Sequence, residues 1–217
     1  LTGKTPLVLA VEQEDVDAVK QLLLLSSPSS SCKNGSKKDA VIHVDQPTYR
    51  GVTPLMLAVT LKNIPIVTAL LKAGANAQRG NPMRGLTPLY VAALNGSEKI
   101  VSLLIPHSDI NCQTLDTLAT PLHAGAEWGH LKVVTTLLEA GAIVDRGGNE
   151  TPLLAAARTG HSSCVKALLM GGADPMRVEK KTHKTAVEIS EENKHHSTIN
   201  ALLTWQHFHS FTVDESQ

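Results

Sequence analysis

Two kinds of short apolar stretch alternate along the chain. The first kind is a run of small and branched apolar residues directly after Thr-Pro, as in "TPLMLAV" from Thr53. The second kind places Val and Leu at the three- and four-residue spacing of an amphipathic helix, as in "KVVTTLLEAGA" from Lys132. Because helices this short are marginal in isolation, we expect each pair to pack against its neighbours.

The two stretches recur together as one unit. Each unit opens with a threonine, and these stand at Thr5, Thr53, Thr87, Thr120 and Thr151, followed by an altered copy at Thr185. The intervals are 48, 34, 33, 31 and 34 residues. Self-similarity with a period near 33 indicates stacked supersecondary units. The first interval exceeds that period by 15 residues and therefore predicts an insertion between the first two units.

The residues around each stretch predict where its helix begins and ends. The threonine hydroxyl can cap a helix by accepting a hydrogen bond from a backbone N–H, and proline suits the first helical position. Glycine, as in Gly129-His130 and Gly160-His161, is expected to end the first helix in the left-handed conformation. Gly-Ala, as at Gly141, should end the second helix, and the turn residues that follow predict a hairpin loop.

These units resemble the ankyrin repeat, a β-turn and two antiparallel helices with a Thr-Pro-Leu-His signature. The matching openings are "GKTPL" at Gly3, "GVTPL" at Gly51, "GLTPL" at Gly85 and "TPLH" at Thr120. The resemblance extends from about Leu1 to Leu203. It implies an all-α fold, an ankyrin-repeat solenoid of stacked helix-turn-helix units joined by β-hairpin loops.

The repeat phase divides the chain into a single array over residues 1–205, an insertion and a tail. The predicted units are residues 1–25, 48–80, 82–113, 115–145, 147–178 and 181–205. Residues 26–45 are rich in Ser and Lys and are expected to form a flexible insertion, with a regulatory or partner-binding arm as the alternative. Residues 206–217 are expected to form a C-terminal tail. The polar sixth unit should cap the stack, and the start at Leu1 suggests a piece of a longer chain.

Some units depart from the family pattern. Only His123 keeps the motif histidine; the other units have Val8, Met56, Tyr90, Leu154 and Glu188 in its place. The resemblance implies that this histidine bonds neighbouring loops, so the other junctions are expected to be less rigid. Pro106 should end its helix near Leu104 or Ile105, because proline cannot continue the helical hydrogen bonds.

Composition narrows the function classes. Lys plus Arg and Asp plus Glu number 20 each, which argues against binding to nucleic acid or to an anionic membrane. No apolar run approaches the ~20 residues of a membrane span, so no direct membrane insertion is expected. No signal-peptide pattern is found in the first residues given, and the three cysteines, Cys32, Cys112 and Cys164, fit a reducing compartment. We therefore expect a cytoplasmic protein, with the nucleus as the alternative.

No catalytic motif stands out. The chain has no GxSxG, Walker-type glycine loop or HExxH sequence. Cys164 and His161 are spaced like a nucleophile and base, but the repeat assigns them to packing and to the turn. The histidines near the C-terminus lack a convergent set of metal ligands; they are His195, His196, His207 and His209. We expect no enzyme activity, no metal and no cofactor.

A one-dimensional stack builds an extended concave face. The resemblance implies that a partner meets the hairpin tips and the ends of the first helices on that face. The repeat phase places these candidate partner-binding residues there: Tyr49, Arg50, Met83, Arg84, Leu94, Asn95, Asp116, Glu127, Trp128, Arg158 and Lys181. Trp128 is the strongest candidate, because tryptophan dominates interface hot spots and the core does not need it at this position.

The sequence thus predicts a protein–protein interaction module, a monomeric array within a larger chain. It would bind a protein or peptide, and not nucleic acid, as a scaffold or substrate-recruiting part. The alternative is a regulatory region of an enzyme or channel whose catalytic or pore part lies elsewhere. An enzyme in its own right is the third hypothesis, with Cys164 and His161 as its best site.

Overall fold

The computed structural model describes residues 4–25 and 43–210, with side chains to residue 207. Within these residues all regular structure is helical, in twelve α-helices and one short 3-10 helix. This confirms the all-α fold class.

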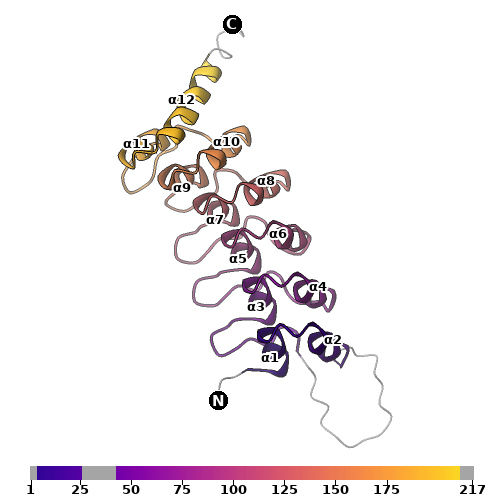
Figure 1. Cartoon of the computed structure of the whole chain (residues 1–217). Coiled ribbons are helices and arrows are strands. Elements are labelled where there is room, and N and C mark those ends of the chain that lie inside the picture. Colours follow the sequence, from indigo (N-terminus) through magenta and orange to yellow (C-terminus); the bar gives the residue numbers. More distant parts are fainter. Residues whose placement is uncertain (1–3, 26–42, 211–217) are drawn as a thin grey trace, which may run out of the picture.

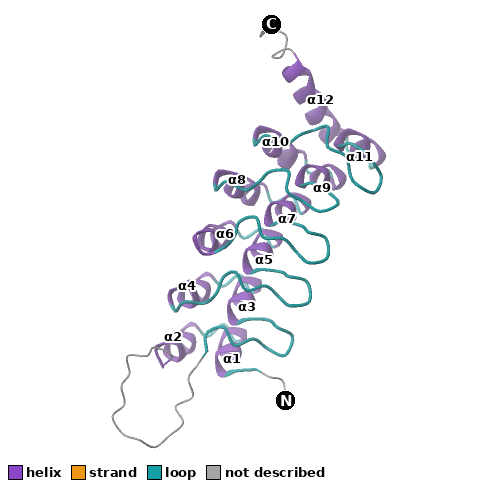
Figure 2. Ribbon diagram, turned by 180° about the vertical axis from the view of Figure 1, so that it is seen from behind, coloured by secondary structure: helices purple, strands orange, loops and turns teal. Residues whose placement is uncertain are grey.

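The helices pair into six units stacked in a line (Figure 1). The first helices of the units are α1 (Pro6–Glu12), α3 (Pro54–Thr60), α5 (Pro88–Leu94), α7 (Pro121–Glu127), α9 (Pro152–Thr159) and α11 (Ala186–Glu192). The second helices are α2 (Val16–Leu25), α4 (Ile64–Lys72), α6 (Glu98–Leu104), α8 (Leu131–Glu139), α10 (Ser162–Met170) and α12 (His196–Ser210). The first helices of units 1–5 form one row and the second helices another, and the loops project beside the first row (Figure 2).

The first helices begin where the sequence predicts. In unit 2 the Thr53 hydroxyl accepts a hydrogen bond from the backbone N–H of Met56 at 3.2 Å. The equivalent bond is present at Thr5, Thr87, Thr120, Thr151 and Thr185. In unit 6, where alanine replaces the proline, Glu188 completes a capping box with Thr185. The repeated threonine therefore fixes the start of every first helix.

One leucine per unit fills the space between successive first helices. It follows the proline in each of units 1–5, and all five copies are buried: Leu7, Leu55, Leu89, Leu122 and Leu153. Alanines in the same helices, such as Ala92 and Ala93, are fully buried and let neighbouring helices approach closely. The core is therefore continuous along the stack, as expected for units that cannot bury their apolar faces alone.

The turn between the two helices of a unit always contains one left-handed residue. These residues are Glu14, Lys62, Gly96, Gly129, Gly160 and Lys194, with φ between 55° and 80°. The prediction that glycine ends the first helix is confirmed in units 3, 4 and 5, for which it was made. In the other three units a charged residue takes the same conformation.

A histidine follows the turn residue in units 4, 5 and 6, and its contact with the preceding unit explains which turns need glycine. The rings of His130, His161 and His195 lie against the turn glycine of the preceding unit. A Cβ on Gly129, for example, would come within 2.5 Å of His161 Nδ1. His195 Nε2 also lies 3.0 Å from the Arg158 carbonyl oxygen, which ties unit 6 to unit 5.

Where the turn residue is charged, the next unit has no histidine at this position. Asn63 follows Glu14 in the stack, and its amide donates to the Glu14 carboxylate at 3.1 Å. Lys62 Nζ donates to the Asn95 carbonyl at 2.9 Å, beside the smaller Ser97. Each junction is therefore bridged through the turn, either by an imidazole on glycine or by a polar side chain.

The loops are hairpin-shaped, but none of the described residues forms a strand. Two backbone bonds close each of several loops, such as Asn81 N–H to the Leu86 carbonyl at 2.9 Å and Gly85 N–H to the Asn81 carbonyl at 2.7 Å. Neighbouring loops are linked by the bonds from Leu115 N–H to the Arg84 carbonyl and from Lys180 N–H to the Asn149 carbonyl. The family's β-hairpins are thus present here as turns held together by isolated backbone bonds.

Three predicted boundaries can be compared with the structure. Helix α6 ends at Leu104, and the 3-10 helix η1 (Ile105–His107) carries Pro106, as predicted. Most of the predicted insertion, residues 26–42, lies outside the described residues. Its last residue belongs to the array, because the Asp45 carboxylate accepts from the Asn76 backbone N–H at 2.9 Å. The tail predicted from residue 206 also begins later, since α12 continues to Ser210.

Candidate functional site

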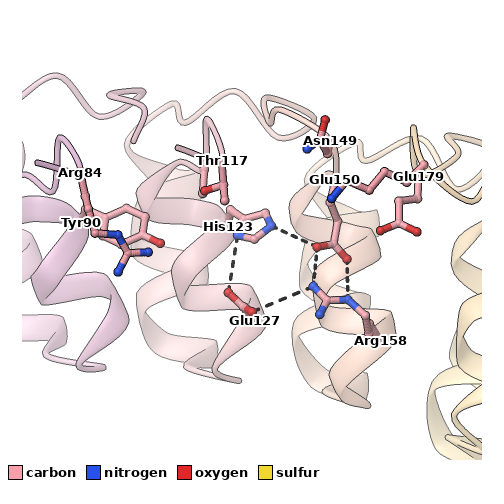
Figure 3. A pocket seen from close by; sticks show the side chains of 11 residues that line it. Arg84, Tyr90, Thr117, His123, Glu127, Asn149, Glu150, Arg158 and Glu179 are labelled. Atoms are coloured by element: carbon pink, nitrogen blue, oxygen red, sulfur yellow. Dashed lines mark hydrogen bonds and ion pairs between the residues drawn. The ribbon is translucent and has the colours of Figure 1, made fainter. Parts of the chain in front are cut away.

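A cavity of about 430 Å³ opens on the face formed by the first helices and the loops, here called the inner face (Figure 3). It spans units 3 to 6. Its lining consists mainly of charged and polar side chains: Arg84, Tyr90, Thr117, Ala119, His123, Glu127, Asn149, Glu150, Arg158, Glu179 and Lys181. A cavity of this size that joins four units is the candidate site of the array.

His123 lies between two carboxylates at the centre of the cavity (Figure 3). It projects from α7 and is only 7% exposed. Its Nε2 is 3.6 Å from Glu150 Oε2, and its Nδ1 is 3.9 Å from Glu127 Oε2. The buried Nδ1 has no hydrogen-bond partner. The resemblance implied that the motif histidine hydrogen-bonds neighbouring loops. At these distances His123 instead stands within ion-pair distance of both carboxylates.

Glu150 and Arg158 form the strongest ion pair of the cavity. Arg158 Nε donates to Glu150 Oε1 at 2.9 Å, and Nη2 contacts Oε2, so the guanidinium binds the carboxylate through two nitrogens. The two residues are eight positions apart, one before the threonine cap and one near the end of α9. The same spacing pairs Lys4 with Glu12 and Lys184 with Glu192.

Glu127 occupies the equivalent position at the end of α7, but Ala119 stands eight residues before it, so the pair that Arg158 makes with Glu150 has no counterpart here. The closest cationic atom is Arg158 Nη2 of the next unit, at 4.0 Å. The carboxylate of Glu127 is therefore left facing the cavity.

The environment shifts several ionisation equilibria. Burial by itself would raise the pKa of Glu150, but His123 and Arg158 outweigh it, so this pKa lies below its ordinary value. The pKa of Tyr90 is raised, mainly by burial and then by the charge of Glu127. At the rim, Arg84 Nε donates to Asp116 at 2.9 Å, and this bond helps to lower the pKa of Asp116 to about 2. At neutral pH the carboxylates of Glu150 and Asp116 are therefore ionised, and the Tyr90 phenol keeps its proton.

The structure brings together some of the residues predicted from the sequence. Arg84, Glu127, Arg158 and Lys181 line the cavity, and Asp116 is paired with Arg84. These residues lie in four different units and meet only because the units stack.

Other predicted residues lie on the inner face beside the cavity or away from it. The Arg50 guanidinium stands 5.5 Å from the centre of the Tyr49 ring, and Met83 is 80% exposed in the next loop. Leu94, Asn95 and Trp128 sit at the far ends of their helices and do not line the cavity. The carbonyls of Leu94 and Asn95 are occupied by His130 and Lys62, while the Trp128 side chain is largely exposed.

Sequence reasoning placed Thr117 at a hairpin tip but missed the other lining residues, namely Tyr90, Ala119, His123, Asn149, Glu150 and Glu179. One signal could have found part of this set. The spacing of eight between Glu150 and Arg158 repeats that of Lys4 and Glu12, which identifies ion pairs along the first helix.

Cys164 and His161, which were considered as a nucleophile and base, both lie in packing contacts. Cys164 is 1% exposed on α10, and burial raises the pKa of its thiol to about 11. His161 lies against Gly129 in the turn of the preceding unit. Among the described residues, no group of three or more potential ligands could hold a metal ion, and no helix is long and apolar enough to cross a bilayer.

We expect Cys164 to resist alkylation in the folded protein. With a pKa of about 11, its thiolate fraction at pH 8 is roughly 100-fold below that of an ordinary cysteine, and its burial slows attack further. Iodoacetamide labelling followed by mass spectrometry should show modification of Cys164 only after urea is added. Labelling of Cys164 at the rate of a model peptide would contradict the burial described here.

Comparison with known proteins gives consistent matches to one repeat family. The family model "Ankyrin repeats (3 copies)" matches residues 1–81 and 55–147, and the model "Ankyrin repeat" matches residues 148–180. Human Rabankyrin-5 is 30% identical over 145 residues, which cover 66% of this chain and 11% of that protein.

Two further relatives show the range of proteins that carry similar arrays. Alpha-latrocrustotoxin-Lt1a of Latrodectus tredecimguttatus is 35% identical over 99 residues, 45% of this chain and 7% of the toxin. The human transient receptor potential cation channel subfamily A member 1 is 26% identical over 171 residues, 66% of this chain and 15% of the channel protein. The chain thus spans about a tenth of the length of these relatives.

Proposed function

Since the chain belongs to the ankyrin repeat family, we propose that it binds a partner protein or peptide on its inner face. In this proposal it is the scaffold or substrate-recruiting part of a larger protein, and it binds without turnover. Ankyrin repeats are generally protein-interaction modules. The binding surface on the inner face and the role as a scaffold are proposed here for this chain.

The observation that carries the proposal is a row of large apolar side chains on successive loops of the inner face. Tyr49, Met83 and Leu115 belong to units 2, 3 and 4, and each is at least 66% exposed. Arg50 and Arg84 stand next to the first two. Aromatic, methionine and arginine side chains are enriched at protein interfaces. Such a row beside a polar cavity supports recognition of an extended segment that crosses several units.

A regulatory role is the second candidate function. It is favoured by the similarity to a protein named as a cation channel, of which this chain matches only 15%. In that case the array would bind its partner on behalf of a pore or catalytic domain elsewhere in a longer protein. The presence of a pore or catalytic domain in the native chain discriminates between the two. For either function we propose a cytoplasmic location, with the nucleus as the alternative.

Removal of the apolar row should abolish partner binding. We expect the variant Tyr49→Ser, Met83→Ser, Leu115→Ser to recover at least 10-fold less of its specific partner in an affinity pull-down quantified by mass spectrometry. The reason is that the loss of hot-spot side chains costs more than about 1.4 kcal/mol of binding free energy. All three side chains are exposed, so the helical circular dichroism signal should not change.

A matched control removes equally exposed apolar side chains at the end of α10 and in the loop that follows. Met170 and Met176 are 79% and 65% exposed, and neither lies in the row. A Met170→Ser, Met176→Ser variant should retain the partner. If the control loses the partner and the first variant keeps it, the inner face is not the binding surface.

A further inference from the structure

The centre of the cavity has hydrogen-bond acceptors without donors. Glu127 is a part-exposed carboxylate whose closest side-chain nitrogens, His123 Nδ1 and Arg158 Nη2, are 3.9 and 4.0 Å away. Both distances exceed that of a hydrogen bond. Glu127 is thus a carboxylate that the described part of the array does not hydrogen-bond.

The tautomer of His123 adds a second acceptor. Its Nε2 faces the Glu150 carboxylate, which can only accept, so the proton of the neutral ring belongs on Nε2. Nδ1 then carries a lone pair on the side of Glu127. This nitrogen is buried and has no partner. Two acceptors therefore stand next to each other in the cavity wall.

The two arginines of the cavity are already engaged, and its third cation, Lys181, is an exposed residue of the unit 6 loop. Arg158 holds Glu150 through two nitrogens, and Arg84 holds Asp116. An anionic ligand would have to compete with these carboxylates and would meet the unbonded Glu127. A cationic ligand would find that carboxylate free, with charge complementarity already in place.

The aromatic side chain in the wall of the cavity favours a planar cation. Tyr90 lines the same cavity, and its phenol lies within the electrostatic influence of Glu127. A guanidinium can donate two N–H groups to a carboxylate and stack on an aromatic face, which an ammonium does less well.

From these observations we propose that the cavity is a binding site for a single arginine side chain of the partner. Its guanidinium would donate to the Glu127 carboxylate, near His123 Nδ1, with the ring of Tyr90 at its side. This inference rests on the proposed function and names the chemistry that the partner supplies at the inner face.

The test uses short peptide probes on the full chain. The peptide acetyl-Ala-Arg-Ala-amide is titrated and followed by chemical-shift changes in NMR spectra, with the citrulline and glutamate versions as controls. Citrulline keeps the shape of arginine but lacks its charge. The arginine probe should bind with a Kd on the order of millimolar, as one side chain supplies only about 4 kcal/mol. The shifts should centre on Tyr90, His123 and Glu127, and the citrulline probe should bind at least 10-fold more weakly.

Variants assign the effect to one carboxylate. Glu127→Gln should weaken the arginine probe at least 10-fold, while Glu139→Gln, at the exposed end of α8, should change nothing. Equal binding of arginine and citrulline, binding of the glutamate probe, an unchanged affinity in Glu127→Gln, or no shift at the cavity would each overturn the inference. The apolar row is not altered in these variants, so its pull-down result tests the proposed function separately.

Discussion

Gly129→Ala should destabilise the array by about 2–4 kcal/mol. Gly129 has a φ of +72°, which costs any other L-residue free energy, and its Cβ would stand 2.5 Å from the ring of His161. The imidazole must then leave its place on the preceding unit. Urea unfolding followed by far-UV circular dichroism measures the loss.

Two controls separate the backbone effect from the steric effect. Gly141 has a φ of +87°, but a Cβ there would meet no atom within 4 Å. Gly141→Ala should therefore cost only about 1 kcal/mol. In a His161→Ala background, Gly129→Ala should also cost no more than that. If Gly129→Ala were as mild as Gly141→Ala in the unaltered chain, the contact between the units would contribute nothing.

Arg158→Met is expected to cost about 2 kcal/mol of stability at pH 7. The Glu150 side chain is only 13% exposed, and without the guanidinium it would remain ionised with a single neighbouring ring. Removing one partner of a buried pair typically costs 3–5 kcal/mol. The lower value applies because the Arg158 side chain is 42% exposed and solvent screens the pair.

The pH dependence identifies the carboxylate as the cause. In the unaltered protein the pKa of Glu150 is lower in the folded state than in the unfolded chain. Its contribution is therefore present above the unfolded value of about 4.3 and is lost as the pH falls through the folded value. In Arg158→Met the guanidinium no longer opposes the effect of burial, so the pKa of Glu150 in the folded state rises. Protonation of Glu150 then removes the free-energy cost of the buried, unpaired charge. The stabilities of the two proteins should converge between pH 7 and pH 4.

The control for this prediction is the exposed pair at the rim of the cavity. Arg84 and Asp116 are both exposed, so Arg84→Met should change the stability by less than about 0.5 kcal/mol. In addition, Glu150→Gln should recover part of the loss in Arg158→Met, because it removes the unpaired charge. A pH-independent loss in Arg158→Met would mean that only packing was removed.

The fold could be predicted from local signals. The six threonine caps, the prolines and the end of α6 before Pro106 depend on neighbours within a few residues, so a single sequence contains all the information for them. The repeat period then predicts that the units stack on one another. The turns of units 1 and 2 were not predicted in this way, because Glu14 and Lys62 adopt the left-handed conformation without glycine. The size of the residue in the following unit decides whether a side chain fits there.

The candidate site was only partly predictable for a related reason. The repeat phase locates Arg84, Glu127 and Arg158 on the inner face, but it does not say which of them meet across units. His123 was singled out for its place in the motif, yet its two carboxylate neighbours come from the end of its own helix and from the next loop. Trp128 was chosen for its chemistry, and one residue beyond Glu127 it no longer faces the cavity.

The contact between a histidine and the preceding glycine also limits how such a chain can evolve by unit duplication or exchange. A tandem copy of unit 4 would place His130 against Gly129 and keep the contact. If units 2 and 4 exchanged places, Lys62 would meet His161, and a side chain would occupy the space that the ring needs. Recombination between repeats is therefore tolerated only when the turn of one unit and the first residues of the next are inherited as compatible partners.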